Sequence, residues 1–284
     1  MIALLAEKPQ PTYPADYLLA RLPARRQRWE AVFAPRSDDP ASSGWGAMAA
    51  EFRWLYGQLH RRLRQELAPL FVYFELRPLF LFLRGLEREG EACRALLPPT
   101  LLAEEVKRVL PQARDAAAAV RLLAGFWPAG AALERLHAAG GPAAVEQEMT
   151  RQVLAAGARS SVALRGFWGA LIDLENLMAL AKRRRWRAEQ AFGYGSGGTI
   201  APRRLVAAGQ GATSLLRHPL AAMVDRAVQE GAWPLEDVLI ERVRQQLRRL
   251  EDPLAPAAAV AAYMWGAHAT TRRLAMMSGR EAAA

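Results

Sequence analysis

Asp173 and Asn176 are the two polar side chains whose spacing most clearly suggests a chemical role. They stand three residues apart in the segment LIDLENLMALAKRRRWR, residues 171–187, and this spacing places them one turn apart on a helix. The Asp173 carboxylate can accept a hydrogen bond from the Asn176 amide or from a helix N-terminus, or pair with a nearby arginine, so we expect it to be buried or partly buried and structural. Leucines recur every third residue from Leu174, so the segment is equally typical of a core helix with a solvated basic end.

A run of four cations ends this segment: Lys182, Arg183, Arg184 and Arg185. The run suits contact with an acidic partner, although a solvated helix end is its more common use. The whole chain carries a formal net charge of +10. Such a surplus implies acidic partners, either nucleic acid, anionic lipid headgroups or an acidic protein face, and charge alone does not choose among them.

The stretch Phe192–Ile200, FGYGSGGTI, is the one glycine-dense part of the sequence. A phosphate-binding Walker loop ends in Gly-Lys-Ser or Gly-Lys-Thr, whereas here Gly197 and Gly198 lead into Thr-Ile-Ala-Pro. No predicted strand precedes the stretch either. We therefore interpret it as a turn that directs the next helix, with Pro202 at the first helical position.

The other polar residues form no pattern typical of catalysis or metal binding. The four histidines are scattered and form no metal-binding pair, and the single cysteine, Cys93, can form neither an internal disulfide nor a cysteine-based zinc site. The sequence contains no Gly-x-Ser-x-Gly elbow and no Asp-Asp-x-x-Asp cluster of the kind that helical prenyl synthases use. We expect a protein without a catalytic site, cofactor or metal.

The composition favours an all-α protein. Hydrophobic residues make up 52% of the 284 residues, alanine, leucine and arginine dominate, and β-branched residues are scarce. No alternating run between turn residues predicts a strand. No stretch is apolar over the length that a bilayer requires, and no positive region precedes the short apolar run at the N-terminus. We expect a cytoplasmic protein, which leaves attachment to a membrane complex open.

Apolar periodicity and turn residues predict a series of helices. We expect Pro69 to end one helix, Pro78 to bend or break the next, and Gly140-Gly141-Pro142 to form a helix-to-helix turn. Residues 34–46 are expected to form a loop. The predicted helices are Tyr13–Phe33, Met48–Ala68, Phe71–Glu89, Leu101–Leu110, Ala113–Phe126, Gly130–Ala139, Ala143–Ala156, Ser160–Glu189, Pro202–Gln210, Ala212–Arg217, Pro219–Gly231, Pro234–Leu250 and Ala257–Ser278.

Two of these helices share a pattern of an acid, a leucine four residues later and a cation nine residues after the acid, and the last helix carries a weaker copy. The first two copies match Glu75 to Asp173, Leu79 to Leu177 and Arg84 to Lys182. A third copy is weaker, with Ala267 at the acidic position, Thr270 in place of Asn176, and Arg272 and Arg273 beyond. This recurrence predicts a threefold internal repeat of helical bundles, with boundaries at 1–98, 99–200 and 201–284.

The order and spacing of these residues resemble the C subunit of V/A-type rotary ATPases, whose equivalent in vacuolar enzymes is the d subunit. The central match is Asp173-x-x-Asn176-Leu177 with Lys182, followed by Phe192, Gly197-Gly198-x-Ile200 and Leu205. The segment from Glu75 to Arg84 looks like the family's first copy, and Tyr263–Arg272 looks like its last. Pro78 replaces the asparagine of the first copy, and Ala267 replaces the glutamate of the last.

The resemblance implies an all-helical funnel of three pseudo-repeated bundles that catalyses nothing itself. It implies a place on the cytoplasmic face of the membrane rotor ring, as a socket for the D/F-type central-stalk subunits, coupling the stalk to proton or sodium transport. The three repeat helices would line the cavity. The candidate partner contacts are Arg84, Lys182, Arg183, Arg184, Arg185, Arg272 and Arg273, and anionic lipid headgroups are a further possible partner.

A basic all-helical nucleic-acid-binding or adaptor module is the competing interpretation. The net charge fits it, but no helix-turn-helix or RNA-binding pattern supports it.

Overall fold

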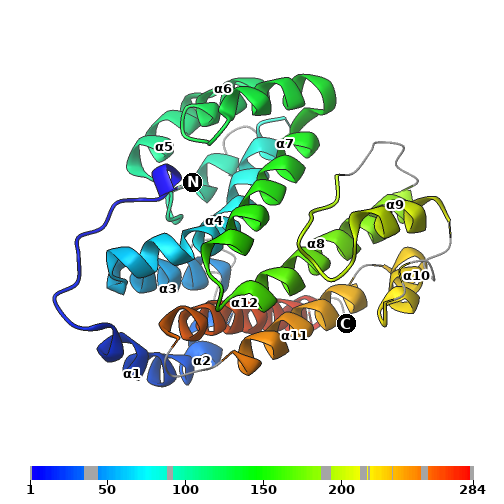
Figure 1. The fold of residues 1–284 in the computed structure, drawn as a ribbon. Helices are drawn as coiled ribbons and strands as arrows, with labels where there is room; N and C mark the ends of the chain where they lie inside the picture. The colour runs from blue at the N-terminus through cyan, green and yellow to red at the C-terminus, as the bar shows by residue number, and fades with distance from the viewer. Residues whose placement is uncertain are drawn as a thin grey trace. The chain divides into compact units, whose positions relative to one another are not determined.

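The computed structural model describes residues 2–34, 44–87, 92–186, 193–211, 216, 218–231, 233–250 and 255–281. Across these residues the regular structure is helical, and an isolated antiparallel bridge between Leu5 and Leu102 is the one strand-like feature among them (Figure 1). The prediction of an all-α protein is therefore confirmed. No helix in the described ranges is long and apolar enough to cross a membrane.

Twelve α-helices and three short 3₁₀ helices can be assigned in the described ranges. The α-helices are α1 Ala15–Arg26, α2 Trp29–Phe33, α3 Gly44–Gln58, α4 Arg61–Gly85, α5 Glu104–Val109, α6 Ala116–Ala124, α7 Gly130–Ser160, α8 Arg165–Trp186, α9 Pro202–Gln210, α10 Ala221–Glu230, α11 Trp233–Arg249 and α12 Pro256–Glu281. The 3₁₀ helices are η1 Ile2–Leu4, η3 Ala92–Leu96 and η4 Leu110–Gln112.

The chain divides into two compact units. Unit 1 comprises Met1–Val153 and Ala259–Ala284, and unit 2 comprises Leu154–Ala258. These boundaries differ from the predicted repeats 1–98, 99–200 and 201–284, which rest on a sequence pattern and remain a prediction.

In unit 1, α4 packs against α6 and η3, and its burial explains why two prolines do not end it. The prediction that Pro69 ends a helix is wrong, and Pro78 does not break one, because α4 runs through both. A bend at Pro78 stays a prediction. A proline inside a helix costs about 3 kcal/mol. Leu70, Phe71 and Val72 are fully buried just after Pro69, and each such side chain contributes about 1.5–3 kcal/mol. Tertiary burial therefore outweighs the local cost.

The N-terminal segment of unit 1 lies beside the turn that leads into α5. The Ala6 N–H donates to the Leu101 carbonyl, and the Ala103 N–H donates to the Leu4 carbonyl, both at 2.8 Å. Leu4 and Leu101 are almost completely buried. Leu4, Leu5 and Ala6 are thus part of the core of unit 1.

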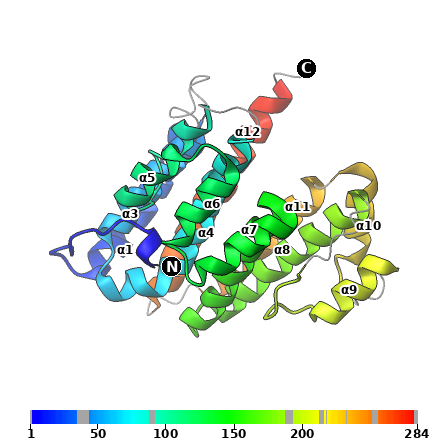
Figure 2. The ribbon, with the colours of Figure 1, turned by 90° about the horizontal axis from the view of Figure 1, so that it is seen from above.

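In unit 2, α8 is the central helix and packs against α9, α10 and α11, as Figure 1 and Figure 2 show. It is shorter than the predicted Ser160–Glu189, and residues 187–189 lie outside the described part. The predicted bounds Pro202–Gln210 are those of α9, with Pro202 in its first turn. The predicted helix Ala212–Arg217 lies almost wholly outside the described residues.

The predicted turn at Gly140-Gly141-Pro142 is a kink inside α7. Gly141 has a φ of 64° and a ψ of −164°, which is not helical, and the helix continues on both sides of it. A positive φ favours glycine, so glycine suits the backbone conformation at position 141.

Candidate functional site

The Asp173 carboxylate of α8 holds the turn that leads into α9. The residue is 2% exposed. Its Oδ2 accepts hydrogen bonds from the Thr199 N–H at 3.0 Å and from the Thr199 hydroxyl at 2.5 Å, and its Oδ1 accepts one from the Ile200 N–H at 3.2 Å. Asp173 is therefore buried, as expected, but its partners belong to the glycine-rich turn and are neither Asn176 nor an arginine.

Asn176 holds the same turn four residues earlier. Its side-chain Nδ2 donates to the Gly195 carbonyl at 2.9 Å, and the Gly195 N–H donates to its Oδ1 at 2.8 Å. This reciprocal pair leaves the amide with a partner on each end. Asp173 and Asn176 thus act together as a two-point clamp, which we call the α8 clamp, on residues 195–200.

The glycines of the turn allow its backbone to approach α8 closely enough for the hydrogen bonds of the α8 clamp. A Cβ atom at Gly198 would lie 2.2 Å from Asp173 Oδ1 and 3.1 Å from Ile172 Cγ2. Gly197 has a φ of 104°, in the region that favours glycine, and a Cβ there would lie 3.2 Å from Ile172 Cδ1. Glycine is required here for close packing against α8, and no phosphate-binding role is needed to explain it.

Glu75 of α4 occupies a similar place in unit 1. It is 5% exposed and accepts a hydrogen bond from the backbone N–H of Leu101, while its Oε2 has no hydrogen-bond partner among the described residues. Burial raises the pKa of Glu75 to about 7, against the opposing effects of the Leu101 hydrogen bond and the positive charges of Lys107 and Arg53. We call this contact between Glu75 and Leu101 the α4 clamp.

The two clamps share their spacing along the chain. Leu101 follows Glu75 by 26 residues, and Thr199 follows Asp173 by 26 residues. The helix after each turn, α5 or α9, begins 29 residues after the acid. Leu79 and Leu177, one helical turn after each acid, are both fully buried.

The basic end of α8 is largely engaged within unit 2. Arg184 forms an ion pair with Asp225 of α10, with 2.8 Å between Nη1 and Oδ1. Arg183 and Arg185 lie at the C-terminal ends of α9 and α10, because their Nη1 atoms are 3.4 and 3.2 Å from the Cβ positions built on Gly209 and Gly231. Cations are favourable at helix C-termini. Lys182, in contrast, is exposed and forms no ion pair with a described residue.

The candidate cations of unit 1 also form ion pairs or are buried within the unit. Arg84 forms an ion pair with Glu146 of α7, with 2.6 Å between Nε and Oε1, and its side chain remains 59% exposed. Arg273 pairs with Glu30 of α2 at 2.5 Å on the surface. Arg272 is 8% exposed and is mostly packed inside the unit. Whether these residues also bind a partner stays a prediction.

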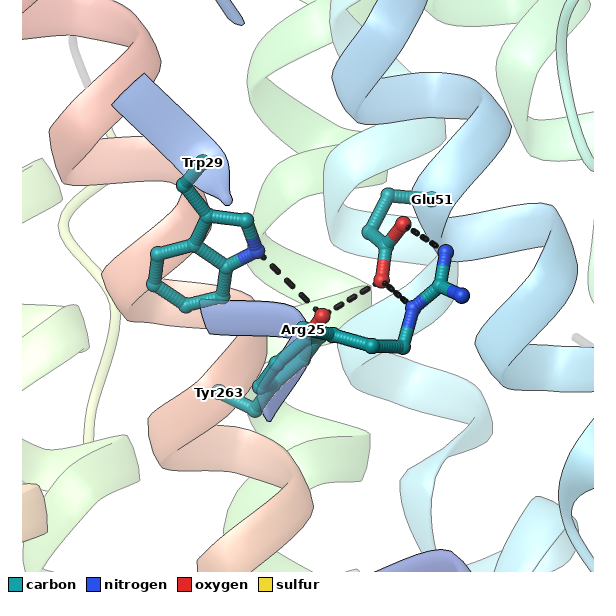
Figure 3. Close-up of polar contacts among 4 residues, drawn as sticks. All are labelled: Arg25, Trp29, Glu51 and Tyr263. Atoms are coloured by element: carbon teal, nitrogen blue, oxygen red, sulfur yellow. Dashed lines mark hydrogen bonds and ion pairs between the residues drawn. The ribbon is translucent and has the colours of Figure 1, made fainter. Parts of the chain in front are cut away.

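Sequence reasoning missed a polar cluster that joins both ends of the chain within unit 1 (Figure 3). Glu51 of α3 receives two hydrogen bonds from the Arg25 guanidinium, at 2.7 and 2.5 Å, and another from the Tyr263 hydroxyl of α12. Trp29 Nε1 donates to the Tyr263 oxygen at 3.2 Å. Burial, and then the Glu51 contact, raise the pKa of Tyr263. Because Glu51 and Tyr263 are 212 residues apart, no spacing pattern could have joined them.

These geometries support structural roles for the buried acids. No group of three or more histidine, cysteine, aspartate or glutamate side chains in the described ranges could hold a metal ion. No protein-family model matches the chain, and a search of curated proteins finds no significant match.

Proposed function

We propose that this chain is a non-catalytic rotor subunit of a V/A-type rotary ATPase, a socket that couples the central stalk to the membrane rotor ring. The observation that carries the proposal is the recurrence of one buried-acid contact 98 residues apart, in the α4 clamp and the α8 clamp. An internal repeat built on acidic helices is what the resemblance to this rotary-ATPase family implies. Each clamp fixes a short helix to a long one within its own unit.

The third copy of the proposed repeat fits the same scheme without an acid. Ala267 of α12 is fully buried, so a methyl group stands where a carboxylate would need several donors. The helix is held through Tyr263, one turn earlier, whose hydroxyl binds Glu51. We propose that the three bundles form a funnel, with α4, α8 and α12 on its inner wall.

A torque-transmitting part must be stiff and must present charge to its neighbours. The clamps and the dense helix packing supply stiffness. Lys182, which is exposed, and Arg84, whose side chain is 59% exposed, remain accessible to the C-terminal carbonyls of a stalk helix. The proposed partners are therefore the D/F-type stalk subunits and the rotor ring, on the cytoplasmic face of the membrane.

Affinity purification of the tagged chain from its native membranes tests the assignment. Stalk and ring subunits should co-purify in fixed proportion. If the chain instead binds nucleic acid at micromolar concentration, with an affinity that falls steeply with salt, the competing nucleic-acid-binding interpretation replaces the rotor proposal.

A charge reversal then locates the stalk contact. Lys182→Glu should weaken binding to purified stalk subunits, and Arg165→Glu, at an exposed position of the same helix, is the matched control. Arg84→Glu is less suitable, because it would place a second carboxylate against Glu146, whose side chain is only 10% exposed. Equal stalk binding by both variants and the wild type would remove Lys182 from the interface.

A further inference from the structure

A basic pocket in unit 1 lies next to the α4 clamp. Its volume is about 500 Å³, within the range of small-molecule sites. Among the described residues that line it, four are cations and one is an acid. These are Lys8, Arg53, Lys107, Arg108 and Glu104. Leu101, whose N–H binds Glu75, also lines it, so Glu75 lies directly behind the pocket wall.

The N-terminal segment, which forms one wall of the pocket, is held by hydrogen bonds to its backbone. Arg64, which is 7% exposed, donates to the carbonyls of Lys8 and Pro9 at 2.5 and 2.6 Å. The Ala6 N–H donates to the Leu101 carbonyl at 2.8 Å on the other side. The backbone of the N-terminal segment that carries Lys8 is thus held in place beside the pocket.

The cations are only partly neutralised. Lys107, whose side chain is 15% exposed, pairs with Glu104 at 3.0 Å, and Arg108 lies 3.8 Å from Glu105. Lys8 and Arg53 form no ion pair with a described residue. A cleft lined by one sign of charge concentrates ligands of the opposite sign. The lining has a formal excess of three positive charges, which suits a multiply charged anion better than a single carboxylate.

The two cations that α5 contributes to the pocket have no counterpart at the matching positions of α9. With the 98-residue spacing of the two clamps, Lys107 and Arg108 correspond to Leu205 and Val206 of α9. Leu205 is fully buried, so that position serves the core of unit 2. The cations of α5 are therefore not explained by the clamp, which works in unit 2 without them.

We propose that this pocket binds a compound carrying two or more phosphate charges, either a soluble polyphosphorylated molecule or the headgroup of a phosphorylated lipid. The site is independent of the rotor proposal. Arg53 and Lys107 provide the inner contacts, and Lys8 and Arg108 close the rim. The positive charges of Lys107 and Arg53 lower the pKa of Glu75, and a bound anion would offset them. The pKa of Glu75 should therefore rise on binding, and Glu75 should take up a proton.

Calorimetry with inorganic pyrophosphate and the full chain at low salt tests the site. The Arg53→Gln, Lys107→Gln double variant should weaken binding about tenfold or more, because charge-assisted hydrogen bonds are lost. Arg114→Gln with Arg121→Gln removes the same charge from exposed positions of unit 1 and should leave binding within about twofold. If both pairs weaken binding equally, the attraction is general and the pocket is not a site.

Two further measurements keep the proposal open to refutation. Lys8→Gln changes an exposed side chain, so it should weaken binding even if the double variant unfolds. Titrations near pH 7 in buffers of different ionisation enthalpy should show more proton uptake for the wild type than for Glu75→Gln. Equal uptake would show that the bound anion does not affect Glu75 and would contradict its proposed place in the pocket.

Vesicles distinguish the two sources of phosphate. Flotation with phosphatidylcholine vesicles, with and without phosphatidylinositol phosphate, should show retention by the phosphorylated lipid alone if the ligand is a headgroup. Pyrophosphate binding without vesicle binding would indicate a soluble compound. Binding of neither probe by the wild type overturns the proposal.

Discussion

The α8 clamp and the α4 clamp place an acid in the same relation to a turn, yet the two carboxyl groups are hydrogen-bonded to different extents. Both oxygens of Asp173 accept hydrogen bonds, from two backbone N–H groups and one hydroxyl. Glu75 receives a hydrogen bond from Leu101, while its Oε2 has no partner among the described residues. A buried carboxyl group with few hydrogen-bond donors tends to bind a proton, in agreement with the raised pKa of Glu75.

The residues opposite the acids explain the difference. Thr199 supplies a hydroxyl as well as an N–H, whereas Leu101, at the corresponding place in unit 1, has an apolar side chain. Gly198 lets the turn approach the carboxylate, whereas Thr100 stands at the equivalent position and donates its hydroxyl to Leu97. The same chain spacing can thus hold either a carboxylate with hydrogen bonds to both oxygens or one whose second oxygen has no partner among the described residues, and the residues of the turn decide which.

Breaking the α8 clamp at its glycine should have the largest effect. Gly198→Ala should destabilise the protein by about 3 kcal/mol or more, since its Cβ would lie 2.2 Å from Asp173 Oδ1 and must push the clamp open. Gly193→Ala is the control, because a Cβ there meets nothing within 4 Å. Denaturant unfolding measures both, and equal midpoints would show that the clamp is looser than the structure indicates.

Removing the charge of Glu75 from the α4 clamp should stabilise the protein, and the gain in unfolding free energy should depend on pH. The folded pKa of Glu75 is about 7, and its ordinary value is 4.5. Between these values the folded state binds more protons than the unfolded chain, so rising pH destabilises the wild type. The pH-dependent loss is absent below pH 4.5 and complete above pH 7, where it amounts to roughly 3 kcal/mol.

Glu75→Gln should remove this pH dependence, since its amide oxygen still accepts from Leu101 and it carries no charge. Unfolding free energies of the variant and the wild type, compared at pH 5 and pH 8, should diverge in favour of the variant at the higher pH. A constant difference across that interval would mean that Glu75 ionises normally in the folded protein.

Asp173→Ala should show the cost of removing a carboxyl group whose two oxygens are both hydrogen-bonded. The change leaves the N–H groups of Thr199 and Ile200 without their acceptor, and we expect a loss of about 1–3 kcal/mol. Thermal unfolding at neutral pH is the measurement, and an unchanged midpoint would show that the carboxylate contributes nothing. Glu75→Gln at the same pH is the matched comparison, because there the loss of a carboxylate should be stabilising.

Periodicity and turn chemistry predicted the all-helical character and part of the α8 clamp, whereas several helix bounds differ; the predicted helix Tyr13–Phe33, for example, is two helices, α1 and α2. The bounds of α9 and the kink at Gly141 follow from local signals, namely Pro202 and a glycine pair. Asp173 and Asn176 stood out by their spacing, but their partners lie 19–27 residues away and are chosen by tertiary packing. The error at Pro69 has the same origin, since local propensity cannot weigh the burial that surrounds it.

Contacts across longer distances gave no sequence signal at all. Glu51 lies on an amphipathic helix and Tyr263 opens a predicted repeat, and nothing in either pattern indicates that they meet. The basic run on α8 looked like a partner surface or a solvated end, whereas Arg184 binds Asp225 within unit 2. A run of basic residues in the sequence shows where cations are concentrated. Only the folded structure shows which acids they pair with and which helix ends they contact.

Thr199→Val is the smallest change and isolates what the hydroxyl adds to the α8 clamp. It removes the hydrogen bond from Thr199 Oγ1 to Asp173 Oδ2 and keeps the backbone N–H that binds the same oxygen. Because Thr199 is exposed, valine brings little new burial, so we expect a loss of about 1 kcal/mol. In the Asp173→Ala background the hydroxyl has no carboxylate to bind, so Thr199→Val should then be nearly neutral. A double-mutant cycle by denaturant unfolding measures this coupling. If Thr199→Val costs the same in both backgrounds, the hydrogen bond from the hydroxyl to Asp173 does not contribute to stability, and the difference between the two clamps must come from backbone donors alone.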